Sequence, residues 1–164
     1  MTSSRRIFLP ILVVAGTAAI AGCGSSTLSD QEREGLTRQA VTLQDQLAKA
    51  GDRATACATP EKIKKEGAQG VGTCLGNALD TSSQQVTKVS DYVKKLAGNA
   101  SGDCQSKLED FAGALDGTAN TLGDASAIAK KGEIDKIGKE LQGISENQVD
   151  VQVAGRDADK ACDG

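Results

Sequence analysis

The chain has 164 residues, of which 38% are apolar, 25% charged and only 2% aromatic, and it contains neither His nor Trp. This length fits one domain of ordinary size. The absence of His excludes Ser-His-Asp and Cys-His nucleophilic catalysis, His-ligated zinc and the usual proximal haem ligand. We therefore expect no enzymatic activity, no cofactor and no bound metal ion.

Residues 1–22 have the features of a cleaved signal peptide. Arg5 and Arg6 give a positively charged start, and a mainly apolar stretch follows from Ile7 to Ile20. A membrane-spanning helix needs about 20 apolar residues, so a stretch of this length is more typical of a signal-peptide core. Residues 4–9, Ser-Arg-Arg-Ile-Phe-Leu, also resemble the twin-arginine export motif. The sequence leaves the export route open between that pathway and the general secretory one.

The end of this leader, Ile20-Ala21-Gly22-Cys23, resembles the lipobox of bacterial lipoproteins, in which an aliphatic and two small residues precede a Cys. The resemblance covers the leader only, and it identifies no family for the remaining chain. It implies that a diacylglycerol is attached to the Cys23 thiol and that cleavage leaves Cys23 as the new N-terminus. Two acyl chains give stable anchoring, whereas one gives marginal binding. The alternative is an ordinary secreted protein in which Cys23 holds this position by chance.

The chain after the leader is acidic and nearly free of aromatic residues. It carries 17 Lys and Arg against 22 Asp and Glu, a formal charge of −5. Such a chain lacks both the positive charge and the stacking surfaces that bind nucleic acid, so we expect no nucleic-acid partner. Residues 23–29 are rich in Gly and Ser and predict a flexible tether. Residues 30–164 form the predicted folded domain.

Four segments of this domain have apolar or small residues spaced alternately by three and four, the pattern of an amphipathic helix. Ser29 and Glu32 match a capping box at the start of the first. Its inward-facing positions are Leu36, Ala40, Leu43, Leu47, Ala50, Ala54 and Cys57. Those of the second are Leu75, Leu79, Ser82, Val86, Val89, Val93 and Leu96. Those of the third are Cys104, Leu108, Phe111, Leu115, Thr118, Leu122, Ala125 and Ala129. Those of the fourth are Ile134, Ile137, Leu141, Ile144, Gln148, Val151, Gly155, Ala158 and Cys162.

Two stretches interrupt this regular picture. Thr59, Pro60 and Glu61 predict the start of a short helical turn, and the glycines between residues 67 and 72 predict a loop after it. Residues 148–153 alternate polar and apolar, which is a strand pattern. A lone strand leaves its backbone groups without partners, so we favour helix there.

Four helices with short connections predict an all-α fold, an up-down-up-down antiparallel four-helix bundle. Without Cys23, four cysteines remain, which outside the cytoplasm indicates two disulfides. Their spacing lacks the short knuckles typical of zinc sites and the C-x-x-C of redox pairs. In the bundle, Cys57 and Cys74 fall at one end and Cys104 and Cys162 at the other. The geometry therefore predicts the pairs Cys57–Cys74 and Cys104–Cys162.

Several other patterns fail as sites. Residues 116–120 resemble the start of a calcium loop, but Thr121 and Ala127 stand where such a loop requires Gly and Glu. Residues 132–140 have the wrong spacing for a phosphate-binding loop. Glu109 and Asp110 fall at solvated positions without any sign of burial. Tyr92 is predicted at the edge of the core with its hydroxyl in water. A tyrosinate can also bind haem iron, but the sequence offers no plausible second ligand for the metal.

The sequence thus predicts a non-enzymatic lipoprotein on the extracytoplasmic face of the cell membrane. Its bundle acts as a binding or scaffold module for another envelope component, which we expect to be a protein. The alternative is a carrier that holds an apolar small ligand between its helices.

Overall fold

The computed structural model describes residues 28–163, except the side chains of residues 134, 135, 138, 139, 141 and 145. The predicted signal peptide, residues 1–22, and Cys23 lie outside the described residues. The described chain forms four α-helices and contains no strand: α1 (Asp30–Cys57), α2 (Pro60–Asn99), α3 (Gly102–Lys130) and α4 (Ile134–Cys162). The predicted all-α class is confirmed, and residues 148–153 are helical.

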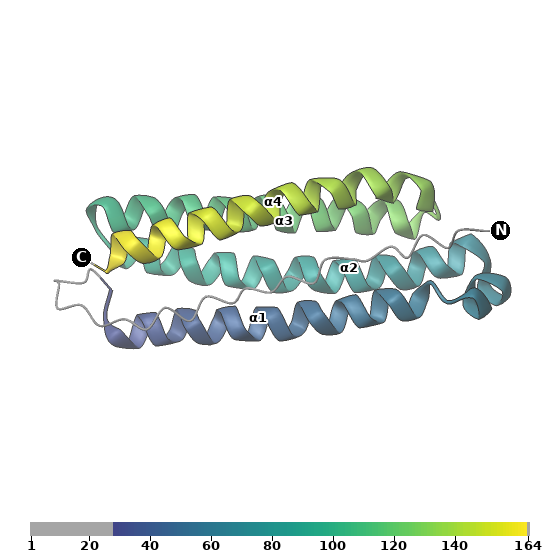
Figure 1. The fold of residues 1–164 in the computed structure, drawn as a ribbon, viewed down its shortest axis with the longest axis horizontal. Coiled ribbons are helices and arrows are strands. Elements are labelled where there is room, and N and C mark those ends of the chain that lie inside the picture. Colours follow the sequence, from purple (N-terminus) through teal and green to yellow (C-terminus); the bar gives the residue numbers. More distant parts are fainter. Residues whose placement is uncertain (1–27, 164) are drawn as a thin grey trace, which may run out of the picture.

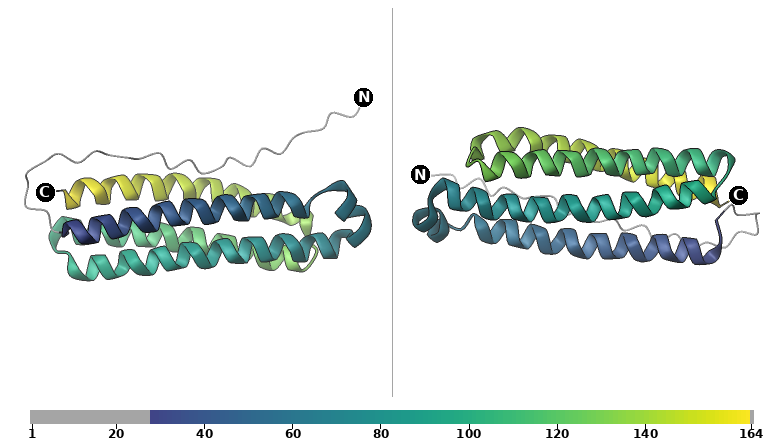
Figure 2. Two further views of the ribbon diagram at one scale, coloured as in Figure 1. Left: turned by 90° about the horizontal axis from the view of Figure 1, so that it is seen from below. Right: turned by 180° about the vertical axis from the view of Figure 1, so that it is seen from behind.

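The helices lie side by side as a bundle, and each packs extensively against its neighbour in the chain (Figures 1 and 2). Contacts between α2 and α3 are the most extensive, with α1 packed on α2 and α4 packed on α3. The start of α1 lies at the same end of the bundle as the end of α4 (Figure 1).

The core lies mainly between α2 and α3. Most of the predicted inward positions of these two helices are buried, which confirms both heptad patterns. The prediction is less accurate for α1, where Ala40 is exposed and Gly35 is buried instead. Since the extensive contacts of α1 are with α2, only a narrow face of α1 is covered.

Hydrogen bonds from serine side chains hold α2 and α3 close together. The hydroxyl of Ser83 donates to the carbonyl oxygen of Ala119 over 2.7 Å, and that of Ser126 donates to the carbonyl of Gly76 over 2.8 Å. A buried hydroxyl is costly unless it has a partner, and these backbone oxygens provide one. Small residues at these positions therefore bring the helices together.

The predicted loop between residues 67 and 72 is wrong. Gly67 does break the helix, with φ 64° and ψ −174°, but the chain is helical again through Gly70 and Gly72. A side chain at Gly72 would collide with the carbonyl oxygen of Ala129 in α3. Gly72 is therefore needed for a close helix contact, which composition alone cannot distinguish from a loop.

Both predicted helix starts are confirmed. The amide of Ser29 donates to Glu32 Oε2 over 2.9 Å, and the amide of Glu32 donates to Ser29 Oγ over 3.3 Å, which together form the capping box. Thr59 caps α2 in the same way, accepting from the amide of Lys62, and Pro60 follows at the first helical position.

Candidate functional site

Two disulfides join the cysteines in the predicted pairs. Cys57–Cys74 connects the end of α1 to α2, with its Cα atoms 5.7 Å apart. Cys104–Cys162 connects the start of α3 to the end of α4, with its Cα atoms 4.7 Å apart. The two bonds stand near opposite ends of the bundle, so each fixes one end. These four cysteines therefore have a structural role.

The end of the bundle at which the described chain begins is tightly held. Leu28 is buried in the core although it falls in the predicted tether of residues 23–29. Arg33 of α1 forms an ion pair with Asp163, and its Nη2 donates to the carbonyl oxygen of Cys162 over 2.6 Å. The folded domain thus includes the last residues of the predicted tether, and α1 is fastened to the end of α4.

Tyr92 of α2 strengthens the same end. Its hydroxyl lies over Gly35 and donates to the carbonyl oxygen of Glu32 over 3.4 Å. The prediction that this hydroxyl lies in water is therefore wrong; a side chain on Gly35 would occupy its place. Hydrogen bonds from the backbone and side chain of Ser29, and from Asn99, hold the pKa of the Glu32 carboxyl below its ordinary value.

A polar network connects α2 to α3 halfway along the bundle. The hydroxyl of Ser90, which is fully buried, donates to Asp116 Oδ1 over 2.6 Å, and Lys94 Nζ lies 2.8 Å from Asp116 Oδ2. Burial would raise the pKa of Asp116, but the hydrogen bonds from Lys94 and Ser90 outweigh it and lower that pKa. The hydrogen bond to Asp116 raises the pKa of Lys94 in turn. Because Ser90 has no access to solvent, its hydroxyl is not an exposed nucleophile, and its hydrogen bonds hold the two helices together.

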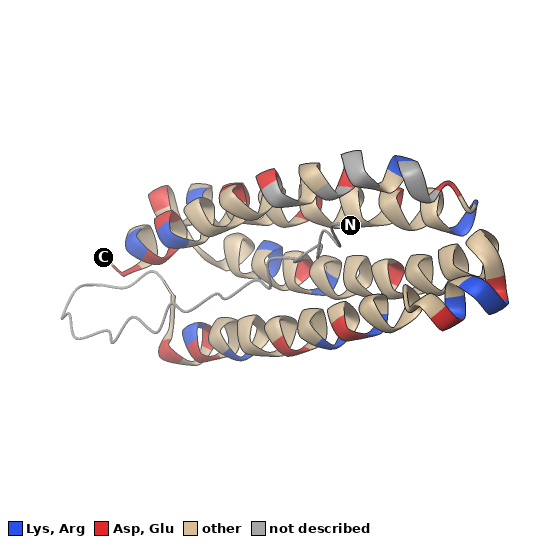
Figure 3. Cartoon of the chain, turned by 45° about the vertical axis from the view of Figure 1, so that its right-hand side comes forward, with Lys and Arg blue, Asp and Glu red and all other residues tan. Residues whose placement is uncertain are grey.

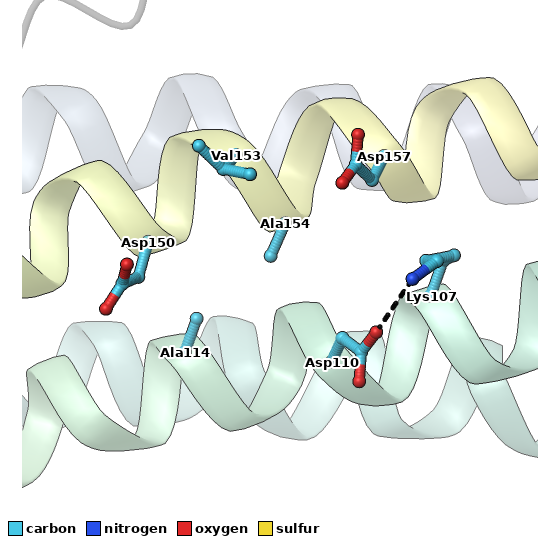
Figure 4. A pocket seen from close by; sticks show the side chains of 7 residues that line it. All are labelled: Lys107, Asp110, Ala114, Asp150, Val153, Ala154 and Asp157. Carbon is cyan, nitrogen blue, oxygen red and sulfur yellow. Dashed lines mark hydrogen bonds and ion pairs between the residues drawn. The ribbon is translucent and has the colours of Figure 1, made fainter.

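A candidate pocket is an open hollow of about 320 Å³ between α3 and α4. Figure 4 shows Asp110 paired with Lys107 across one side of it and Asp150 and Asp157 on the α4 side. Its full lining is Lys107, Asp110, Ala114, Asp150, Val153, Ala154 and Asp157. A pocket for a small apolar ligand is lined predominantly by apolar side chains, whereas four of the seven side chains that line this hollow are charged.

The other positions considered from the sequence are not brought together. Residues 116–120 lie within helix α3, and both Glu109 and Asp110 are exposed, as predicted. Among the side chains that the structure describes, no group of three His, Cys, Asp or Glu is arranged to hold a metal ion. None of the described helices is both long and apolar enough to cross a membrane.

Comparisons with known proteins return no match to this chain, whether among protein-family models, curated proteins or solved structures.

Proposed function

We propose that this protein is a non-enzymatic, lipid-anchored lipoprotein of the cell envelope, whose folded domain binds another envelope component. In this proposal Cys23 carries the lipid, the leader of residues 1–22 is removed, and the domain stands on the extracytoplasmic face of the membrane. The observation that carries it is the lipobox-like run Ile20-Ala21-Gly22-Cys23 directly before a disulfide-bonded domain. Disulfides persist in oxidising compartments outside the cytoplasm, which agrees with export.

Only five residue steps separate Cys23 from the packed residue Leu28 along the chain. A lipid on Cys23 would therefore keep one end of the domain near the bilayer. Five residue steps span at most about 18 Å when fully extended. The end that carries Leu28 and the Arg33–Asp163 pair would then face the membrane. A helix the length of α1 extends about 42 Å. The opposite end, with the Cys57–Cys74 bond, would project into the envelope.

The anchor is tested by labelling cells with a clickable fatty acid and comparing the wild type with Cys23→Ser. We expect labelled wild-type protein without residues 1–22 and no label on the variant. Labelling is the decisive readout because an uncleaved leader can itself retain the variant in the membrane. The matched control is Gly24→Ser, which keeps Cys23 and should be labelled like the wild type. Equal labelling of Cys23→Ser would refute the anchor.

We further propose that the domain is an up-down-up-down antiparallel bundle, the finer form of the observed helical arrangement. The contacts between consecutive helices and the two disulfides support it. In this topology a spin label at Thr37 lies near one at Lys95 and far from one at Thr73. Pulsed electron resonance should therefore give a short 37–95 distance and a long 37–73 distance. The reverse order would contradict the topology.

The binding role is tested by crosslinking intact membranes and purifying the protein. Its motive is a compact exported domain without a reactive group of residues, and a reproducible partner is the expected result. Recovery of no specific partner would count against it. A carrier of apolar ligands is not proposed, because four of the seven side chains that line the hollow between α3 and α4 are charged.

A further inference from the structure

Residues 58–69, which we term the distal loop, project from the end of the bundle opposite the start of α1. The segment comprises Ala58, Thr59 and the first turns of α2 on both sides of the break at Gly67, and it extends past the turn between α3 and α4 (Figures 1 and 2). All of its residues are exposed except Lys62, which is half-buried. The distal loop therefore contributes almost nothing to the core, and its conformation needs another explanation.

Several contacts fix this exposed segment in place. The Cys57–Cys74 bond closes it at its base, and Thr59 caps its helical turn. Beyond the break at Gly67, the side-chain amide of Gln69 donates to the carbonyl oxygen of Lys130 over 2.8 Å. An exposed segment that is already ordered loses less conformational entropy when it binds a partner. The distal loop thus has the property expected of a recognition element.

The chemistry of the distal loop combines one apolar side chain with lysines. Ile63 is 51% exposed, one of the few large apolar side chains of the described chain that lie in solvent. Lys64 and Lys65 follow it directly, and neither forms an ion pair with another described residue. Figure 3 shows basic and acidic positions together at this tip of the molecule. The acidic residues of the segment are Glu61 and Glu66. The lysines stand out because the chain after the leader is acidic overall.

We propose that the distal loop is the docking surface for an acidic protein, with Ile63 entering an apolar pocket of that partner and Lys64 and Lys65 facing its carboxylates. This proposal deepens the proposed function, on which it rests for the existence of a partner. An apolar anchor surrounded by charges is a common arrangement in protein interfaces, where the charges steer association. A protein fits better than a bilayer, because surfaces that bind membranes present several apolar side chains.

The test places a photo-crosslinking amino acid at position 63 of the full-length protein and irradiates intact cells. The matched control is position 41, because Val41 is also a large exposed apolar residue, on the side of α1. We expect an adduct with one acidic protein at position 63 and none at position 41. Lys64→Glu with Lys65→Glu should reduce that adduct at least tenfold, since two attractions become repulsions. Lys88→Glu with Lys95→Glu, at exposed positions of α2, should leave it unchanged.

Other outcomes overturn the proposal in distinguishable ways. Equal adducts at positions 41 and 63, an adduct with lipid or with a basic protein, or an adduct insensitive to Lys64→Glu and Lys65→Glu would each refute this docking surface. A third probe, at position 149 on α4, distinguishes a failure of the distal loop from a failure of the proposed binding function. Val149 suits this purpose because it is 59% exposed. Adducts at position 149 alone would refute the distal loop and keep a binding function. No adduct at any of the three positions would refute the distal loop, and it would refute the binding function as well if crosslinking of intact membranes also recovered no partner.

Discussion

Gly72 packs directly against the carbonyl oxygen of Ala129, so that α2 meets the end of α3 through backbone atoms. A Cβ atom at position 72 would approach that oxygen more closely than real Cβ atoms ever do. The oxygen belongs to a helix backbone and has little freedom to move aside. The contact therefore constrains how closely the two most extensively packed helices approach each other.

Gly72→Ala should lower the free energy of unfolding by about 1–3 kcal/mol, the usual cost of forcing extra atoms into a packed contact. The loss is expected even though Ala favours helix over Gly by up to about 1 kcal/mol. Urea denaturation measures it. In the control, Gly113→Ala, no atom lies within 4 Å of the new Cβ, so stability should rise by up to about 1 kcal/mol. A Gly72→Ala variant as stable as Gly113→Ala would contradict this account.

The disulfides should differ in their effect on stability. Cys104 and Cys162 are separated by 58 positions and Cys57 and Cys74 by 17. In the chain-entropy description, the longer loop contributes about 4 kcal/mol and the shorter about 3 kcal/mol. Replacing Cys104 and Cys162 with Ser should lower the thermal midpoint by roughly 15 °C for a domain of this size. Calorimetry of both double variants checks that loss of Cys104–Cys162 lowers the thermal midpoint more than loss of Cys57–Cys74. A thermal midpoint unchanged by full reduction would refute any stabilisation by the disulfides.

Arg33 should matter more than other arginines of α1. Its side chain is 19% exposed and binds Asp163, as well as the carbonyl of Cys162. Arg33→Gln should cost about 1–3 kcal/mol, the range for hydrogen bonds to charged groups. Arg38 is the matched control: its side chain is 63% exposed and pairs with Glu34 on the same helix, so Arg38→Gln should cost at most about 0.5 kcal/mol. Equal losses of unfolding free energy in the two variants, measured by denaturant titration, would show that the contact of Arg33 with the end of α4 adds no stability.

Asp116 should make part of the stability dependent on pH. Its folded-state pKa lies below the ordinary value of 3.8, because hydrogen bonds from Lys94 and Ser90 outweigh the effect of burial. The contribution of the Asp116 carboxylate to the free energy of unfolding is complete when the pH is above that ordinary pKa. It is lost as the pH falls through the lower folded-state pKa. Solvent screening limits it to less than about 1 kcal/mol, since the carboxylate is 39% exposed.

The corresponding variant is Asp116→Asn, which keeps an acceptor for Ser90 and removes the titrating group. Between pH 7 and pH 2.5, its free energy of unfolding should fall less than that of the wild type. Asp110→Asn is the control, because Asp110 is exposed and pairs only locally with Lys107. A wild-type pH profile unchanged by Asp116→Asn would rule out a role for this network in acid stability.

Much of the fold was predictable because its signals are local. The three-four spacing of residues 104–129 identifies one face of a helix, and Ser29 with Glu32 marks a helix start without reference to the rest of the chain. The disulfide pairs followed because helices of similar length joined by short turns bring their ends together. Cys104–Cys162 is the clearest example, since the turn at Gly132 lies midway between the two cysteines.

The errors have a common physical cause. The glycines of residues 67–72 have the composition of a loop, and the hydroxyl of Tyr92 has no sequence signal for its partner in α1. Both depend on how far one helix is shifted and rotated against another. The distal loop was also missed as a surface, because its lysines and Ile63 look like an ordinary solvated turn until the absence of any covering helix is known.

Four amphipathic helices and the pairing of the cysteines could be read from the sequence, and so could the helix ends to within a few residues, except that α2 extends back to Pro60 through the predicted loop. These features follow from periodicity, capping and chain length, which are properties of neighbouring residues. The packed structure was needed to find that Gly72 contacts Ala129, that Arg33 binds Asp163 and that residues 58–69 lie outside the core. Such contacts join residues far apart in the chain, and their geometry depends on the axial position of every helix at once.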